Sequence, residues 1–200
     1  MRLEKASYKA IKYACLKFHY AKRLPAQPMV GFSVFNKKDE WCGVVVFNNG
    51  IGAIEKPFGI KKGQISELAR VALNGKQSLT SRVLSRAIKI FKKQNPLVLL
   101  LVSYSDTDYG HKGTIYQATN WYYIKSLKTG DKFIDPKTGK DIHSRSHSTT
   151  GYNKQFGALK KVIKTSELIK IKKGLKNKYI YPLNKEMHNF CKSISKKYPK

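Results

Sequence analysis

The sequence predicts an α/β (α+β) fold, in which helices flank a mixed β-sheet and a basic C-terminal extension follows. The apolar run Leu97–Val102 is typical of a strand buried on both faces. A strand candidate and an amphipathic helix precede it, and this order is typical of a crossover between parallel strands. Residues 125–200 hold 20 Lys and Arg against 5 Asp and Glu, whereas the longer segment 1–124 holds 20 against 7. We therefore expect a folded core over residues 1–124 and a basic extension over residues 125–200.

The first part of the core is expected to contain one helix and a meander of strands. Tyr8, Ile11, Cys15 and Phe18 recur at helical spacing, and polar turns separate the apolar segments that follow. In chain order the elements are a helix from about Glu4 to His19, strands Met29–Phe35 and Glu40–Phe47 forming a hairpin, and a strand around Ile51–Ile54.

The second part of the core is expected to form the crossover and the end of the sheet. Ser78 can cap the crossover helix, and Pro96 ends it. In chain order the elements are strand Gln64–Leu73, the crossover helix, strand Leu97–Val102, a short helix with Tyr116 and Gln117, and a strand that begins at Trp121.

Within the extension, Lys160–Lys178 is expected to be partly helical. Its apolar residues, such as Val162 and Ile169, should pack back on the core and leave the lysines outward. We expect this segment to contact phosphates more than bases. The candidate contacts are Arg145, Lys154, Lys160, Lys161, Lys164, Lys172 and Lys173.

The charge of the whole chain narrows the class of partner. With 40 Lys and Arg against 12 Asp and Glu, the formal net charge is +28, which favours a polyanion such as nucleic acid. The alternative is a solvated lysine-rich surface with no such role. No segment approaches the roughly 20 apolar residues of a membrane span, and the N-terminus lacks a signal-peptide pattern. The three cysteines, Cys15, Cys42 and Cys191, are scattered along the chain and form no CxxC motif. This pattern favours reduced thiols and a cytoplasmic location.

Polar residues gather where the buried strand ends. Asp106 follows that strand, and His111 and Tyr116 come a few residues later. In open α/β sheets ligands bind outside the carboxyl ends of the strands, so we place a reaction site here. Glu67 and Arg70 are three residues apart on the preceding strand and share one face only if a bulge intervenes. The alternative is a surface ion pair or one residue that points to solvent.

Two further features are candidates for binding an anion or a metal ion. The start of the crossover helix, Ser78–Ser81, presents unpaired backbone N–H groups and is a candidate anion site. His143 and His147 lie in a Ser/Thr-rich segment without a cysteine or acidic partner, so we expect no metal site.

Three segments resemble the Mom family of phage DNA-modification proteins: FHYAKRLP (Phe18–Pro25), ELARVALNG (Glu67–Gly75) and SYSDTDYGHKGTIYQATNWYY (Ser103–Tyr123). The block GHxGxIYQAxNWxY is the specific part. The wider architecture resembles the acyl-CoA N-acyltransferase superfamily. That resemblance implies a sheet whose two middle parallel strands splay apart around the cofactor. It also implies an enzyme that converts the N6 amine of adenine in phage DNA to a carbamoylmethyl derivative and so protects the DNA from host restriction.

The resemblance also implies roles for individual residues. Asp106 is expected to act as general base or to orient the amine, and Tyr116 to donate a proton to the leaving group. Arg70 is expected to hold negative charge. The expected catalytic residues are Tyr20, Arg70, Ser81, Asp106 and Tyr116, and the expected substrate-binding residues are His19, Glu67, His111, Trp121 and Tyr122. The aromatic members can stack on an adenine flipped out of double-stranded DNA.

The donor is not defined by the sequence. The superfamily resemblance suggests acetyl-CoA, but the loop Asn74–Ser78 carries one glycine where acyl-CoA enzymes carry a Q/R-x-x-G-x-G/A motif. An aminoacyl-tRNA is an alternative donor that would suit the basic surface. Two other functions stay open: an N-acyltransferase that acts on a small amine or a protein, and a non-catalytic basic nucleic-acid-binding protein. Under the last reading Tyr116 is a core residue and Asp106 caps a turn.

Overall fold

The computed structural model describes residues 1–50, 52–128, 130–155, 157–172 and 174–199. The chain forms two compact units. One unit, Met1–Ser126 with Asn177–Lys200, contains the large sheet and is called the sheet unit below. The other, Leu127–Lys176, is called the insert because both of its ends join the sheet unit.

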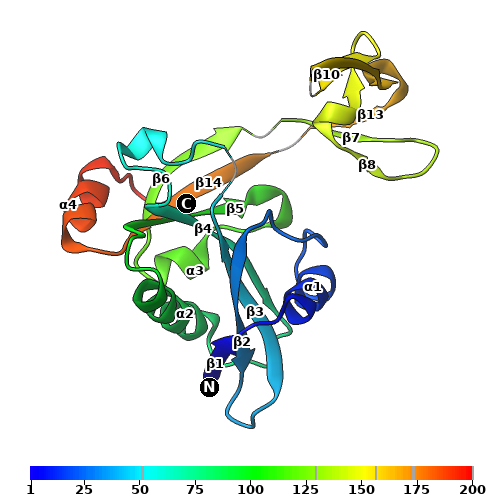
Figure 1. The fold of residues 1–200 in the computed structure, drawn as a ribbon. Coiled ribbons are helices and arrows are strands. Elements are labelled where there is room, and N and C mark those ends of the chain that lie inside the picture. Colours follow the sequence, from blue (N-terminus) through cyan, green and yellow to red (C-terminus); the bar gives the residue numbers. More distant parts are fainter. Residues whose placement is uncertain (51, 129, 156, 173, 200) are drawn as a thin grey trace. The chain divides into compact units, whose positions relative to one another are not determined.

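The sheet unit is built on a seven-stranded sheet with the order β1-β2-β3-β4-β5-β14-β6. Its strands are β1 Arg2–Lys5, β2 Met29–Phe35, β3 Trp41–Asn48, β4 Ile65–Leu73, β5 Leu100–Asp106, β6 Tyr122–Lys128 and β14 Leu175–Pro182. Its helices are α1 Tyr8–Lys17, α2 Thr80–Gln94, α3 Thr114–Gln117 and α4 Lys185–Ile194, with short 3-10 turns η1 Lys56–Phe58 and η2 Thr107–Tyr109. Figure 1 shows these elements along the chain.

The pairing of the strands gives the expected mixed sheet. Strands β1 to β4 pair antiparallel, whereas β4 and β5 are parallel and are joined by α2. This confirms the predicted crossover.

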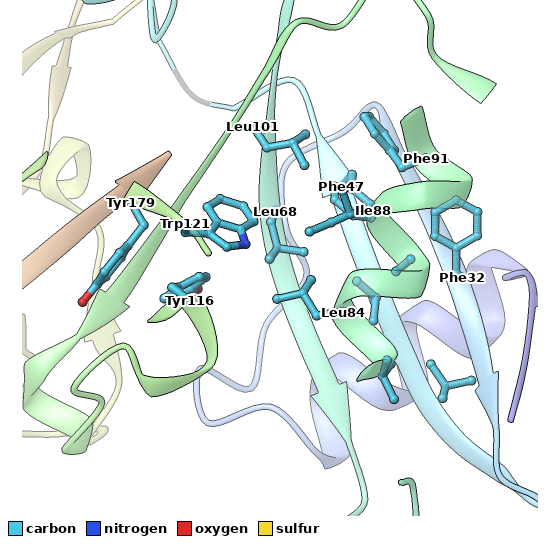
Figure 2. Close-up of a cluster of buried hydrophobic side chains, with 14 of the residues drawn as sticks. Phe32, Phe47, Leu68, Leu84, Ile88, Phe91, Leu101, Tyr116, Trp121 and Tyr179 are labelled. Carbon is cyan, nitrogen blue, oxygen red and sulfur yellow. The ribbon is translucent and has the colours of Figure 1, made fainter. Parts of the chain in front are cut away.

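Each face of the sheet packs on a different set of helices. Alternate residues of β3 separate the faces: Val45 and Phe47 join a core cluster with α2, whereas Val44 and Val46 join a cluster with α1. In β5, Leu101 likewise joins the α2 cluster and Leu100 a cluster that includes residues of α4. Helix α2 therefore covers one face, and α1 and α4 cover the other. Figure 2 shows the α2 side, where Phe47 stacks on Phe91 and Tyr116 lies between Trp121 and Tyr179.

The two parallel strands separate soon after they begin. They pair over Ile65–Glu67 and Leu100–Val102. Beyond that point a side chain bridges them, because the Ser103 hydroxyl donates to the Leu68 carbonyl at 2.8 Å. The opening between the later parts of β4 and β5 is called the split below, and it is the splay expected for this sheet.

The insert contains short strands in small sheets of its own. These are β7 Lys132–Ile134, β8 Asp141–Ile142, β9 His147–Ser148, β10 Tyr152–Gln155, β11 Ala158–Lys161, β12 Ile163–Lys164 and β13 Ile169–Ile171, with turns η3 Ser144–Ser146 and η4 Thr165–Glu167. They pair as β10-β11, β12-β9 and β13-β7-β8.

The structure corrects three predictions about elements. The first helix begins at Tyr8, because Ser7 caps it and the preceding residues form β1. No strand follows the hairpin within Gly52–Ile54, which form bends and a turn, and Ile51 lies outside the described residues. Lys160–Lys178 is not helical in its described part, which forms strands and one 3-10 turn. Its alternating lysines and apolar residues fit an exposed strand as well as a helix.

The predicted division at residues 124 and 125 also differs from the structure. The chain returns to the large sheet at β14 and ends with α4, so the basic segment is an insertion and not a terminal extension. Ile169 and Ile171 belong to the insert and are 52% and 41% exposed, so these two side chains are not buried as predicted.

Candidate active site

A bulge in β4 brings Glu67 and Arg70 to the same face of the sheet. Val46 pairs with Arg70 and Phe47 pairs with Leu68, so Ala69 is an extra residue in β4. Leu68 packs in the α2 cluster, and Glu67, which alternates with it, therefore points to the other face. Val71 also packs in the α2 cluster, and so Arg70 points to the face of α1 as well. The bulge that the sequence analysis named as the condition for a shared site is present.

Asp106 lies at the carboxyl end of β5 and is 6% exposed. Its carboxylate accepts a hydrogen bond from the Asp108 backbone N–H at 3.2 Å, and its carbonyl accepts from the His111 N–H at 3.3 Å. Along β5 it alternates with residues of the α2 side, so it faces the same side as Arg70. The turn-capping role and the site position are therefore compatible.

Four rings surround this end of the sheet on the α1 side. The Tyr20 ring centroid lies 4.2 Å from that of His19, 4.3 Å from that of Tyr109 and 4.8 Å from that of His111. His19 and Tyr20 come from the chain after α1, and the other two rings follow β5. This group of four rings is called the ring cluster below.

Charges from both strands act on the ring cluster. The pKa of the Tyr20 hydroxyl is raised, first by burial and then by the Asp106 carboxylate. Arg70 is half-buried, and its guanidinium donates to the carbonyls of Ala69 at 2.6 Å and Arg23 at 3.4 Å. Burial lowers the pKa of Arg70, and Tyr20 and Glu67 oppose that shift. Tyr20, Arg70, Glu67 and Asp106 are therefore brought together.

His19 is held as a neutral hydrogen-bond donor. Burial, followed by the charge of Arg70, lowers its pKa to about 3. Its Nδ1 accepts from the Ala21 N–H at 3.1 Å, so the neutral ring carries its proton on Nε2. His19 can thus donate a hydrogen bond to a substrate atom but is not poised to accept a proton.

Tyr116 places its hydroxyl at the split. The hydroxyl lies 2.8 Å from the Ser103 hydroxyl and donates to the Tyr104 carbonyl at 3.3 Å. Burial raises the pKa of Tyr116, a hydrogen bond from Ser103 opposes that shift, and Tyr20 raises the pKa further. The phenol therefore stays protonated at neutral pH. Its ring packs in the core, and its hydroxyl lies where β4 and β5 separate.

Ser81 lies on the other side of the sheet from the ring cluster. It lines an open hollow of about 490 Å³ beside the first half of α2. The lining residues are Met1, Ser81, Arg82, Ser85, Arg86, Lys89 and Ala118. Three cations on one helix face beside two serines suit a phosphate-bearing molecule. Ser78 does not cap α2 as predicted, because its hydroxyl lies 3.2 Å from the Met1 sulfur and Leu79 occupies the N-cap position.

Two predicted substrate-binding residues do not reach the ring cluster. Trp121 is fully buried and packs against Tyr116 and Tyr181, so it belongs to the core and offers no surface to a base. Tyr122 lies two strands away from β5, and its hydroxyl is 3.3 Å from His188 of α4. The sequence alone did not separate these aromatics because a core ring and a stacking ring have the same composition.

The predicted phosphate contacts lie in the insert. Arg145, Lys154, Lys160, Lys161, Lys164 and Lys172 are all exposed there, and Lys173 lies outside the described residues. The insert as a sequence holds 13 Lys and Arg against 4 Asp and Glu.

Sequence reasoning missed two residues of the site. Tyr109 is 53% exposed and completes the ring cluster, and Ser103 bridges the split. An aromatic between Asp106 and His111 in an otherwise polar segment was the available signal for Tyr109.

The described residues contain neither a membrane-spanning helix nor a cluster of metal-binding side chains. No helix in the described parts of the chain is long and apolar enough to cross a membrane. No group of three or more His, Cys, Asp or Glu side chains that could hold a metal ion occurs among the residues the structure describes.

The arrangement suits a transfer reaction that runs through the split. One side of the sheet offers rings, a carboxylate and a guanidinium, the split offers a protonated phenol, and the α2 side offers cations. An acceptor with a planar ring fits the first side, and a phosphate-bearing donor fits the other.

Comparisons with known proteins agree with this architecture. The family model described as the Mom protein family matches residues 1–200. A search of curated protein sequences returns no match. Among solved structures, an acetyltransferase of Bacillus subtilis in complex with CoA has a TM-score of 0.50 at 14% identity, covering 92% of this chain and 99% of that chain.

Two further structures are similar at lower scores. A spermidine N-acetyltransferase of Vibrio cholerae has a TM-score of 0.49 at 8% identity, over 95% of this chain and 99% of that chain. A GNAT family acetyltransferase of Elizabethkingia anophelis with acetyl-CoA bound has a TM-score of 0.47 at 10% identity, over 90% and 97%. At these identities the likeness to solved structures concerns the fold, and the expected N-acyltransferase-like fold is confirmed.

Proposed function

This chain belongs to the Mom protein family, and we propose that it modifies DNA by replacing one hydrogen of the adenine N6 amine with a carbamoylmethyl group. The observation that carries the proposal is that Arg70 of β4, Asp106 at the end of β5 and the Tyr20 ring lie on one face of the sheet, while the Tyr116 hydroxyl lies where β4 and β5 stop pairing.

The acceptor is a weak nucleophile. The lone pair of adenine N6 is delocalised into the ring, and in a duplex the amine is paired, so the base must leave the stack. Asp106, fixed by the Asp108 N–H, accepts a proton from N6 as the new N–C bond forms. Tyr116 donates a proton to the group that leaves the donor, and Ser103 holds the phenol in place.

The ring cluster holds the flipped base. Tyr20 and Tyr109 present aromatic surfaces next to Asp106, and stacking on such rings contributes ~1–3 kcal/mol per base. The Nε2–H of His19 donates to an acceptor atom of the purine. Arg70 stabilises negative charge on the substrate side of the split. His111 closes the cluster against Tyr20.

The donor side fits a phosphate-bearing molecule. Arg82, Arg86 and Lys89 would hold the phosphates of either acetyl-CoA or an aminoacyl-tRNA. Attack of N6 on the activated carbonyl of either donor breaks the carbonyl–sulfur or carbonyl–oxygen bond and gives an N6-acyl adenine. The carbamoylmethyl product requires that N6 attack a methylene carbon that bears a carboxamide, with loss of the group bonded to that methylene.

The test is mass spectrometry of nucleosides from plasmid DNA co-expressed with the protein in bacteria. The proposal predicts a deoxyadenosine heavier by one carbamoylmethyl group and plasmid DNA resistant to restriction enzymes whose sites contain the modified adenine. Unmodified deoxyadenosine with a soluble, folded protein would contradict it.

The similarity to N-acetyltransferase structures supports one alternative, acyl transfer to a small amine or a protein. That reaction predicts transfer of label from acetyl-CoA to a non-DNA acceptor, and the same co-expression then yields unmodified DNA.

A further inference from the structure

The insert carries a short antiparallel hairpin with two chemically different faces. Strands β10 and β11 pair Tyr152 with Lys161, Asn153 with Lys160, Lys154 with Leu159 and Gln155 with Ala158. Residues directly opposite each other point to the same side of a hairpin. Tyr152, Lys154, Leu159 and Lys161 therefore share one face, called the front face below.

The back face of the hairpin is tied to the rest of the insert. The Asn153 amide donates to the carbonyls of Arg145 at 3.1 Å and His147 at 2.9 Å. The Gln155 amide donates to the Arg145 carbonyl at 2.6 Å. These bonds fix which side of the hairpin faces outward.

The front face is exposed although half of it is apolar. Leu159 is 72% exposed and Tyr152 is 50% exposed, and the two lie diagonally across the pair of strands. Lys154 and Lys161 occupy the other two corners and are also exposed. Single apolar residues are common on protein surfaces. Here two of them share one face of the hairpin, and the hydrogen bonds of the opposite face keep that face exposed, which indicates a binding surface.

The charge of this surface favours DNA over a protein or lipid partner. The insert holds 13 Lys and Arg against 4 Asp and Glu, and both polar corners of the front face are lysines. A two-stranded ribbon fits the major groove of B-DNA, which is about 12 Å wide, and the spacing between strands is about 4.8 Å. The apolar groups in that groove are the methyl groups of thymine.

We propose that the front face of the β10–β11 hairpin docks in the major groove of double-stranded DNA. Leu159 and Tyr152 contact base edges and thymine methyl groups, and Lys154 and Lys161 contact phosphates on either side. The inference rests on the proposed function only in taking duplex DNA as the partner. It assigns base contact to named residues of a segment for which the sequence predicted contact with phosphates more than with bases.

The experiment measures binding of the full-length protein to a short AT-rich duplex over a range of salt concentrations. Leu159→Ala is expected to weaken binding about fivefold or more without changing the salt slope, because it removes an apolar contact. Lys154→Ala and Lys161→Ala are each expected to lower the salt slope by about one. Lys137→Ala is the matched control: it removes an exposed cation of the same insert that lies off the hairpin and is not a candidate phosphate contact, and it should change neither quantity.

A second duplex with uracil in place of thymine tests the placement in the groove. It lacks the thymine methyl groups, so the unmodified protein should bind it more weakly, whereas Leu159→Ala should bind both duplexes alike. Equal binding of both duplexes by the unmodified protein would overturn major-groove docking. An equal effect of Lys137→Ala and Lys154→Ala would show a diffuse cationic surface and overturn it too.

Two further outcomes are informative. If Leu159→Ala binds DNA normally, the front face serves another partner, such as a protein, and the proposal is wrong. The binding assay requires no modification of DNA. A result that overturns docking of the hairpin can therefore be distinguished from a failure to find modified adenine, which would contradict the proposed function. Circular dichroism melting confirms that each surface variant is folded.

Discussion

The hydroxyl of Tyr116 lies 2.8 Å from the hydroxyl of Ser103, at the point where β4 and β5 stop pairing. The Ser103 hydroxyl also donates to the Leu68 carbonyl at 2.8 Å, and either hydroxyl of the Ser103–Tyr116 pair can donate to the other. A buried phenol is thereby held in the split, between the ring cluster on one face of the sheet and the cation-lined hollow on the other.

Tyr116→Phe removes this hydroxyl and keeps the ring that packs on Trp121 and Tyr179. We expect modification of adenine to fall about 10²-fold or more, as for loss of a general acid, while stability falls by about 1 kcal/mol. Nucleoside mass spectrometry measures the first and thermal melting the second. Tyr123→Phe removes a hydroxyl bonded to Ser126 and serves as control, with activity retained. Full activity of Tyr116→Phe would rule out the acid role.

Asp106→Asn keeps an oxygen that can accept from the Asp108 N–H, so the turn after β5 should form as before. The amide cannot accept a proton from N6, and we expect modified adenine to become undetectable while DNA binding persists. Mass spectrometry and a binding assay on the same preparation give both values. A variant that modifies DNA at the normal rate would assign the general base elsewhere.

Gly113→Ala should disturb the placement of Tyr116. Gly113 has φ +75° at the N-cap of α3, and a Cβ there would collide with the Tyr179 hydroxyl. We expect a loss of about 1–3 kcal/mol in unfolding free energy together with reduced activity. Gly110→Ala is the matched control, since Gly110 has φ +69° but open space around a Cβ. Equal losses in both variants would show that the backbone conformation alone is responsible.

His19 should make stability depend on pH. Its pKa in the folded protein is about 3, below the ordinary value of 6.5, so between these values the unfolded state binds the extra proton. Stability contributed by neutral His19 is full above pH 6.5 and is lost as the pH falls towards 3, with a slope of at most about 1.4 kcal/mol per pH unit. His19→Gln should reduce the slope of unfolding free energy against pH in that window. His143→Gln, on the exposed surface of the insert, should leave the slope as it is.

Arg82→Ala should weaken binding of CoA, used here as a phosphate-bearing probe. Loss of one charge-assisted hydrogen bond corresponds to about 1.5–3 kcal/mol, or roughly tenfold or more in affinity. Isothermal titration calorimetry measures this. Lys92→Ala, an exposed cation near the end of α2 that does not line the hollow, is the control. If neither the unmodified protein nor the variants bind CoA, the donor belongs to another class, such as an aminoacyl-tRNA.

The sequence predicts the strands well where the alternation of apolar and polar residues agrees with the positions of turn-forming residues. The hairpin strands Met29–Phe35 and Glu40–Phe47 match β2 and β3 to within one residue. The strand Leu97–Val102 is displaced, because β5 begins at Leu100 and continues through the polar residues to Asp106. The first of those polar residues, Ser103, bonds to the Leu68 carbonyl and contacts the Tyr116 hydroxyl, and hydropathy does not show such partners.

The site is predicted less evenly. The resemblance to the Mom family supplied Tyr20, Arg70, Asp106 and Tyr116, and their roles stay predictions. In the structure the first three lie on one face of the sheet, and the Tyr116 hydroxyl lies where β4 and β5 stop pairing. The bulge at Ala69 cannot be recognised from the amino-acid composition of β4, because it depends on the pairing register between β4 and β3. Long-range register also decides that Trp121 is core, and neither property is local to a stretch of sequence.

The insert leaves the sheet unit after Ser126 and returns at Asn177, and the side chains of these two residues are hydrogen-bonded at 2.7 Å. The points where the chain leaves and re-enters the sheet unit therefore lie side by side on neighbouring strands. The fifty residues between them can be exchanged, shortened or replaced by a short linker without changing the order of the strands in the sheet. The basic insert and the sheet unit that carries Asp106 and Tyr116 can therefore vary independently in length and sequence.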